Sequence, residues 1–354
     1  MAKNSSLTSL VYTGAMTLLL GGIFLPTLQA EVGKPQELAP GVWFHEGDLA
    51  RRSHCNNGWI VFQDYVLVID ANFPSGAEDV LPKIRAITTL PIRFAFDTHA
   101  HGDHAYGNRT FVEAGATIVA HAGVLEEMKK FETGFFGDKP GRWEDLAKNR
   151  PDVAKSKLSP PTLIFTRDLR FEDRSHLVEL RHLGVAHTRG DGFAWLPKER
   201  ILFTGDACVN GPYNYMGDGN STEWLKTLEA ARALKPLKVC PGHGLMGGPE
   251  VLDQQIEFFT TLRDEVKRRI DDGKKPAEIR EAIPSIKATI QENAKIANYV
   301  GGMFTGQVEK VYLDLVGEPL TAAYLPTASE LQTLAATRSA KTPDRFAGFA
   351  DRKP

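Results

Sequence analysis

The pattern of apolar and polar positions divides the chain into a first part that alternates between strands and helices and a helical last part. Residues 59–62 and 66–69 are apolar runs that flank a short polar segment, which is typical of a β-hairpin. Helical spacing at 80–87, 105–114 and 124–131 alternates with further apolar runs, which indicates layers of helix and strand. The remaining strands are expected at 42–44, 92–96, 117–120, 163–165, 177–183, 192–196, 201–204 and 237–239, with another helix at 222–234.

One segment interrupts this alternation. Residues 134–160 hold glycines and prolines among Phe135, Phe136 and Trp143, and we expect a long loop or lid there. The three aromatic side chains either cover a substrate or pack within the lid.

The pattern changes again near residue 248. Residues 250–316 have charged faces and apolar positions at helical spacing, with a second long amphipathic pattern over 285–315. We therefore expect one domain at 31–248 and a helical C-terminal extension at 249–354.

The first thirty residues have the composition of a secretory signal peptide. Lys3 precedes a stretch without charged residues, and the first acidic residue is Glu31. The apolar part is almost long enough to span a membrane as an uncleaved anchor, but its glycines and Pro26 disfavour a stable helix. We expect residues 1–30 to be removed, leaving a periplasmic or secreted protein without stable membrane insertion.

Composition narrows the classes of function. Hydrophobic residues make up 42% and charged residues 24%, as in soluble globular proteins. The formal net charge of -2 lacks the basic excess of a dedicated nucleic-acid binder, so no nucleic-acid partner is expected. Three cysteines are too few for a disulfide framework, and Cys208 and Cys240 either pair or remain buried thiols.

Three imidazoles and a carboxylate are concentrated within residues 99–104, directly after an apolar strand. If the strand continues, His99 and His101 point to the same side and can bind one ion together. A turn then directs Asp103 and His104 toward a second ion. Imidazole nitrogen combined with carboxylate oxygen suits a borderline ion such as zinc.

Three further candidate ligands, His187, Asp206 and His243, each follow a later apolar strand. A single histidine at a strand end is more often structural than metal-binding. Strand ends meet at one loop edge of an α/β scaffold, however, so the three candidates and the 99–104 cluster together predict a metal site.

In this order the four segments resemble the motifs of the metallo-β-lactamase superfamily. The resemblance covers residues 40–248 and rests on 98–104 (THAHGDH), 186–188 (AHT), 204–206 (TGD) and 241–244 (PGHG). It implies an α/β fold, the αββα sandwich, with two metal ions at one edge. By the same resemblance one ion takes His99, His101 and His187, the second takes Asp103, His104 and His243, and Asp206 bridges both.

Within the superfamily, residues 195–203 and 217–224 resemble the true zinc β-lactamases, but two features differ. Asp206 stands where those enzymes usually have a cysteine ligand, and 206–222 contain no lysine or arginine to bind an antibiotic carboxylate. Aspartate at this position is typical of lactone, ester and thioester hydrolases.

The resemblance implies a zinc-dependent hydrolase in which a hydroxide that bridges two ions attacks the carbonyl of a β-lactam, lactone, ester or thioester. Asp103 would orient this nucleophile, and Asn220 either stabilises the oxyanion or is a turn residue. Manganese or iron can replace zinc at a site with Asp206. The alternatives are a mononuclear iron dioxygenase of the persulfide type and a zinc-binding protein without turnover, and the complete ligand set disfavours both. A small-molecule substrate is expected, and the oligomeric state stays open.

Overall fold

The computed structural model describes residues 31–48, 54–318 and 320. The predicted signal peptide at 1–30 and the last part of the predicted extension, from 321, lie outside the described residues. The first sheet contains seven strands in chain order, antiparallel from β1 to β4 and parallel from β4 to β7. These strands are β1 (Pro35–Ala39), β2 (Val42–His45), β3 (Asn57–Val61), β4 (Val66–Ile69), β5 (Ile92–Asp97), β6 (Thr117–His121) and β7 (Leu163–Phe165).

The second sheet contains five strands in the order β12-β11-β10-β9-β8. The sequence analysis did not include β8, although Leu169 and Phe171 alternate with charged residues there in the pattern of a half-buried strand. In the structure Phe171 is buried and the charged residues are exposed. The strands are β8 (Asp168–Glu172), β9 (Leu177–Arg181), β10 (Phe193–Leu196), β11 (Ile201–Gly205) and β12 (Lys238–Pro241).

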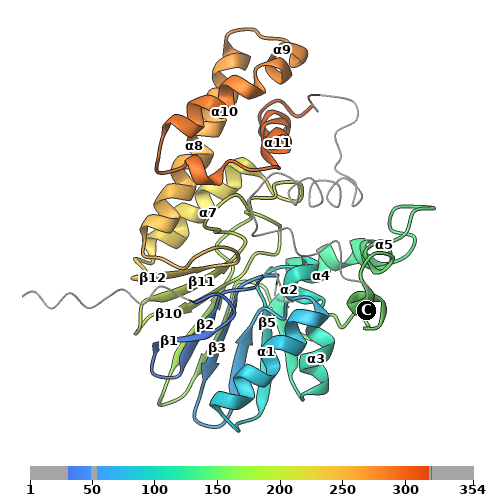
Figure 1. Cartoon of the computed structure of the whole chain (residues 1–354), viewed down its shortest axis with the longest axis vertical. Coiled ribbons are helices and arrows are strands. Elements are labelled where there is room, and N and C mark those ends of the chain that lie inside the picture. The colour runs from blue at the N-terminus through green and yellow to red at the C-terminus, as the bar shows by residue number, and fades with distance from the viewer. Residues whose placement is uncertain (1–30, 49–53, 319, 321–354) are drawn as a thin grey trace, which may run out of the picture.

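The alternation of side chains along each strand builds the layers. Val66 and Val68 of β4 pack with the helix α1 (Pro74–Ile87), whereas Leu67 and Ile69 pack against the second sheet. The second sheet is also buried on both faces. Its inward residues pack in the core between the sheets, and its outward residues pack against α7 (Ser221–Ala233). Both sheets are therefore buried between helical layers (Figure 1), which confirms the predicted αββα sandwich.

Two predicted helical or loop segments are organised differently. The predicted helix at 105–114 is two helices, α2 (Gly102–Ala105) and α3 (Asn108–Glu113), with Gly107 between them. A Cβ at Gly107 would lie 2.2 Å from a main-chain oxygen of Ala71, so the break is where two segments pack most closely.

The predicted loop at 134–160 contains two short helices, α5 (Arg142–Ala147) and α6 (Pro151–Ala154). They follow α4 (Ala122–Met128) and the 3-10 turn η1 (Lys129–Phe131). The glycine and proline that indicated a loop mark helix starts instead, because Gly141 precedes α5 and Pro151 is the first residue of α6.

The extension consists of helices that share a core with the sandwich. The helix α8 (Glu250–Asp271) packs on α7, with the rings of Trp224 and Phe259 4.7 Å apart. The predicted pattern at 285–315 is interrupted between Glu292 and Phe304, where two glycines follow the turn η2. The remaining elements are α9 (Pro276–Glu281), α10 (Ile283–Glu292), η2 (Ala297–Tyr299) and α11 (Phe304–Val316).

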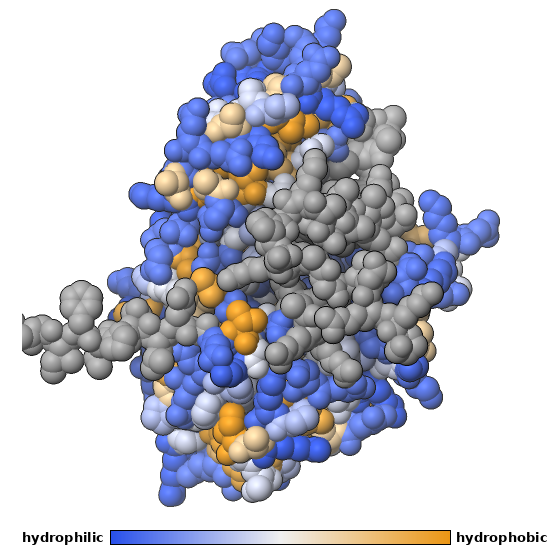
Figure 2. All heavy atoms as spheres, in the orientation of Figure 1, coloured by the Kyte–Doolittle hydropathy of each residue, from blue (hydrophilic) through white to orange (hydrophobic). Residues whose placement is uncertain are grey.

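The outer surface of the extension is mainly polar. On the face seen in Figure 2, hydrophilic residues dominate and hydrophobic residues form small separate patches. Within the described residues, no helix has both the length and the apolar composition needed to cross a membrane.

The cysteines settle a choice that the sequence left open. Cys208 and Cys240 are both buried and free, so they do not form a disulfide. Cys55 is also buried and forms no disulfide, and its thiol lies near His104 and Asp70. Burial raises the pKa of Cys55 to about 12, so it is a neutral thiol in the folded protein.

Candidate metal centre

The predicted ligands meet at one edge of the sandwich. β5 ends at Asp97 just before His99, β11 ends just before Asp206, and β12 ends two residues before His243. The expectation that His99 and His101 lie on a continuing strand is wrong, because the chain bends after Asp97 and His101 is the residue directly before α2. The bend nevertheless directs both imidazoles into one cluster, with ring centres 4.9 Å apart.

The first group contains His99, His101 and His187, whose ligand atoms all lie within 4.8 Å of one another. His101 Nε2 donates to Asp218 Oδ2 at 2.9 Å, and His187 Nδ1 donates to the carbonyl oxygen of Tyr215 at 2.8 Å. These bonds leave the lone pairs on His101 Nδ1 and His187 Nε2, which face each other at 2.7 Å.

The third member of this group also offers a free lone pair. The Thr98 hydroxyl donates to Asp70, so it accepts from His99 Nδ1 at 3.2 Å and leaves His99 Nε2 with the lone pair. His99 Nε2 is buried and has no hydrogen-bond partner among the described residues. Three converging imidazole lone pairs are the arrangement that binds a cation, so the residues present fit a metal ion.

The second group contains Asp103, His104 and His243, again with ligand atoms within 4.8 Å. His243 Nε2 lies 3.2 Å from Asp103 Oδ2 and 3.4 Å from His104 Nε2. His104 Nδ1 donates to Asp70 Oδ2 at 2.8 Å, which leaves His104 Nε2 available to an ion.

Asp206 lies between the two groups. Its Oδ1 is 3.2 Å from His104 Nε2, and its Oδ2 is 3.3 Å from His243 Nε2 and 3.7 Å from His187 Nε2. Gly242 makes this position accessible, because a Cβ there would lie 2.1 Å from Asp206 Oδ1. The carboxylate therefore contacts both groups, as a bridging ligand must.

The protonation behaviour of the two groups differs. Burial, reinforced by His101, lowers the pKa of His187 to about 3, which keeps it in the neutral form that binds metal. Burial works against a charge on His243, but Asp206 and Asp103 raise its pKa to about 9. The carboxylates of the second group thus attract positive charge to the place where an ion would sit.

Residues that the sequence analysis missed hold the ligands in place. Asp70 binds His104 and also accepts from the main chain and hydroxyl of Thr98, at 2.8 and 2.9 Å. Asp70 follows an apolar strand, which is the signal that identified the later ligands. Asp218 lies in the segment 217–220, which the sequence analysis singled out for Asn220 instead.

Three cations from residues 129–150, namely Lys130, Arg142 and Arg150, lie near the cluster, and each is paired with an acid. Arg142 forms two bonds to Asp218, at 2.8 and 3.0 Å, and Lys130 Nζ lies 2.8 Å from the same carboxylate. Arg150 pairs with Asp152 at 2.9 Å and stacks 3.7 Å above the ring of Phe73.

Two other predicted contributors lie outside the ligand groups. Asn220 caps α7, and its side-chain oxygen accepts from the main chain of Thr222 and Glu223, so its role toward an oxyanion stays a prediction. Phe135 and Phe136 are 50% and 42% exposed, whereas Trp143 packs on Tyr106 with ring centres 4.5 Å apart.

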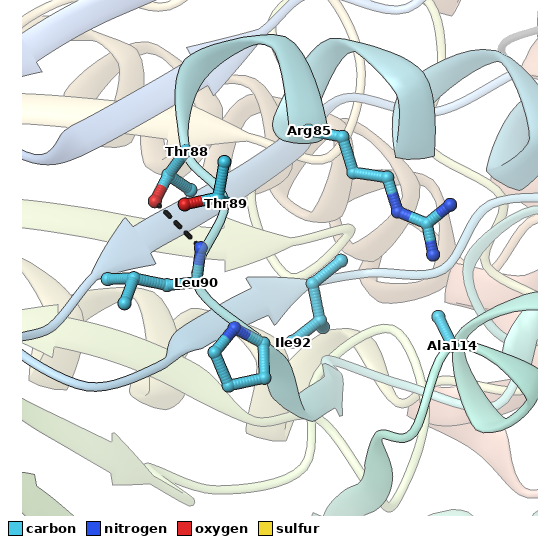
Figure 3. A pocket seen from close by; sticks show the side chains of 7 residues that line it. Arg85, Thr88, Thr89, Leu90, Ile92 and Ala114 are labelled. Atoms are coloured by element: carbon cyan, nitrogen blue, oxygen red, sulfur yellow. Dashed lines mark hydrogen bonds between the residues drawn. The ribbon is translucent and has the colours of Figure 1, made fainter.

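A surface pocket elsewhere lacks this chemistry. It lies where the chain passes from α1 into β5, at the opposite end of β5 from His99 (Figure 3). Its side chains include no histidine, cysteine or acid. The residues that line it are Arg85, Thr88, Thr89, Leu90, Pro91, Ile92 and Ala114.

The fold and the two ligand groups define a metal-dependent hydrolase. The family model of the metallo-beta-lactamase superfamily matches residues 50–243, more than half of the chain, so the chain belongs to this superfamily. A comparison with curated proteins gave no match.

Solved structures share the fold at low sequence identity. A metallo-beta-lactamase from Pontibacter korlensis is 18% identical with a TM-score of 0.51, covering 64% of this chain and 98% of its own. FIM-1 from Pseudomonas aeruginosa, in a mono-zinc form, is 18% identical with a TM-score of 0.50, covering 66% and 96%. The DIM-1 metallo-beta-lactamase is 18% identical with a TM-score of 0.50, covering 65% and 99%.

Proposed function

We propose that the protein is a zinc-dependent hydrolase that cleaves a carbonyl-containing substrate with two divalent ions per chain. One observation carries the proposal. The lone pairs of His101 Nδ1 and His187 Nε2 face each other, with the two nitrogens 2.7 Å apart, and Asp206 lies between this group and the second group of ligands. Imidazole with carboxylate suits zinc, and the similar structure of FIM-1 is named as a mono-zinc form. The oxygen ligand Asp206 also tolerates manganese or iron.

The chain's own residues supply orientation and proton transfer. Divalent ions in such a site lower the pKa of a water molecule and polarise a carbonyl oxygen. The Asp103 side chain is 27% exposed whereas that of Asp206 is 7% exposed, so Asp103 is the carboxylate that an incoming water molecule reaches. Asp103 thus orients the water and accepts its proton, while Asp218 and Tyr215 hold two imidazoles in fixed orientations.

The charges around the cluster favour a neutral substrate. Lys130 and Arg142 are both bound to Asp218, and Arg150 is bound to Asp152. A substrate carboxylate would have to compete with these internal acids for a cation. We therefore propose that lactones, esters or thioesters are better substrates than penicillins.

The site of action is proposed from the N-terminal composition. Residues 1–30 combine a basic start, an apolar middle and no acid before Glu31, which supports export to the periplasm or the medium.

Activity before and after metal removal tests the function. The mature chain is assayed with chromogenic lactones, esters, thioesters and β-lactams, then stripped with a chelator and reloaded with zinc. We expect turnover of at least one substrate class, its loss on stripping and its return with zinc. Turnover that persists without metal, or that consumes oxygen, contradicts the proposal.

A further inference from the structure

Residues 209–220 belong to the connection between β11 and α7 and form one wall of the metal centre, and we call them the tyrosine segment. Its Tyr215 carbonyl and its Asp218 carboxylate bind the first group, at 2.8 Å from His187 Nδ1 and 2.9 Å from His101 Nε2. The ring of Tyr213 lies 5.5 Å from that of His243, on the second group. The orientation of both groups therefore depends on where this segment lies.

The C-terminal extension holds the tyrosine segment from its other side. Gln307 of α11 donates from Nε2 to the main-chain oxygen of Asn214 at 2.7 Å. Near the end of the same helix, Asp314 accepts from the main-chain nitrogen of Ser221 at 2.7 Å, directly after the segment. These contacts join residues 93 positions apart in both cases.

A third contact packs the two segments without a polar bond. A Cβ at Gly301, in the connection between η2 and α11, would lie 2.6 Å from the Cβ of Pro212. The close approach of Gly301 fixes the start of the tyrosine segment, because proline has little freedom to move away.

The bond from Gln307 is shielded from water. Gln307 is 2% exposed and Asn214 is 1% exposed. If the donor is removed, the Asn214 carbonyl is left buried without it, and the segment must shift to find another partner.

The C-terminal extension lies beyond the residues that the family model matches. The family model ends at residue 243, and the Pontibacter korlensis structure is covered over 98% of its length by 64% of this chain. Figure 1 shows α8 to α11 stacked on the α7 side of the sandwich.

We propose that the C-terminal helix α11 positions the metal centre through the tyrosine segment, with Gln307 as the positioning residue. The proposal deepens the proposed function, since it explains what holds His101 and His187 in place. This proposal concerns metal binding directly, and hydrolysis only because hydrolysis depends on the bound metal. The positioning role of α11 and the proposed hydrolase function can therefore fail separately.

The test compares Gln307→Met with Ile290→Ala in the mature chain. Met has nearly the shape of Gln without the donor, whereas Ile290 is a buried apolar side chain of α10, outside both α11 and the tyrosine segment. The readouts are the zinc dissociation constant, the absorption spectrum of the cobalt-loaded protein, and kcat and KM. Loss of a hydrogen-bond partner of a metal-binding imidazole typically lowers metal affinity by about 10–100-fold. For Gln307→Met we expect about tenfold weaker zinc binding and an altered cobalt spectrum.

Ile290→Ala lowers the melting temperature but leaves the zinc affinity and the cobalt spectrum unchanged if the proposal holds. Gly301→Ala is the second variant, because it pushes on Pro212 from a partly exposed position and is expected to act as Gln307→Met does. Unchanged zinc binding in both folded variants, or equal changes in Ile290→Ala, overturns the proposal. Failure of both variants to fold also overturns it, since α11 then serves the fold as a whole. Zinc binding without hydrolysis in the wild type refutes the proposed function and leaves this test intact.

Discussion

The carboxylate of Asp218 lies 2.9 Å from His101 Nε2 and is held from behind by Arg142 and Lys130. Burial alone would raise the pKa of Asp218, but the bonds from His101 and Arg142 hold it well below its usual range. Asp218 is therefore ionised, accepts the Nε2 proton of His101, and leaves Nδ1 as the only atom of that ring that can bind an ion.

The substitution Asp218→Asn should weaken the first group. The amide of this variant can still occupy the space of the carboxylate, but it lacks the charge that fixes His101 and neutralises Arg142 and Lys130. We expect zinc affinity to fall by about 10–100-fold, measured by competition with a chromophoric chelator. Asp253→Asn is the matched control, because this acid is 55% exposed on α8 and should leave zinc affinity unchanged. Equal zinc affinity in both variants would show that Asp218 does not orient His101.

Penicillins should be hydrolysed less efficiently than matched neutral lactones or esters. A charge-assisted contact to a substrate carboxylate contributes about 1.5–3 kcal/mol, and the cations near this cluster are engaged with Asp218 and Asp152. We expect kcat/KM for the penicillin to be about 10–100-fold lower. A penicillin turned over at about 10⁶ M⁻¹s⁻¹ would mean that one of these cations leaves its acid and binds the substrate.

The buried His45 should make stability depend on pH in a defined window. Burial, with a contribution from Lys83 whose Nζ lies 3.0 Å from His45 Nε2, lowers the pKa of His45 from 6.5 to about 4. The unfolded chain therefore binds a proton below pH 6.5 that the folded chain binds only below about 4. The contribution of His45 to stability should therefore fall by roughly 3 kcal/mol as the pH decreases from 6.5 to 4.

Urea unfolding of the wild type and of His45→Gln at pH 7 and at pH 4 measures this dependence. The difference in unfolding free energy between the two proteins should shrink at low pH, because only the wild type loses the contribution of neutral His45. A constant difference between the two pH values contradicts the assignment.

Export predicts a defined N-terminus. Mass spectrometry of the protein isolated from the periplasm or the medium should find a chain that begins at or near Glu31. A membrane-bound form that retains Met1 would show that residues 1–30 are an uncleaved membrane anchor and not a signal peptide.

The ligand set and the layers of the fold could be predicted from the sequence, because each depends on a pattern of neighbouring residues. Four of the ligands lie within one bend at 99–104, and each later candidate follows an apolar strand that could be found from its own residues. The apolar run at 66–69 likewise predicted β4, and the structure buries both of its faces, one on each side of the sheet.

The contacts that hold the ligands were not predictable in this way, because they join distant parts of the chain. His101 and Asp218 are 117 residues apart, and Arg142 reaches the same carboxylate across 76 residues. The sequence analysis named Asn220 as either an oxyanion donor or a turn residue, and in the structure its side-chain oxygen caps the start of α7. The split of 105–114 into two helices likewise depends on the approach of Ala71 to Gly107, which no local pattern contains.

The metal content of the purified mature protein, measured together with that of His101→Ala and His121→Ala, tests the central claim most directly. His121 lies outside both ligand groups and stacks on His182 with ring centres 3.8 Å apart, so its replacement is the matched control. We expect close to two divalent ions per chain, mainly zinc, in the wild type and in His121→Ala, and a loss of metal and activity together in His101→Ala. A wild-type protein without bound divalent metal, or a His101→Ala variant that is active and metal-free, would contradict the account.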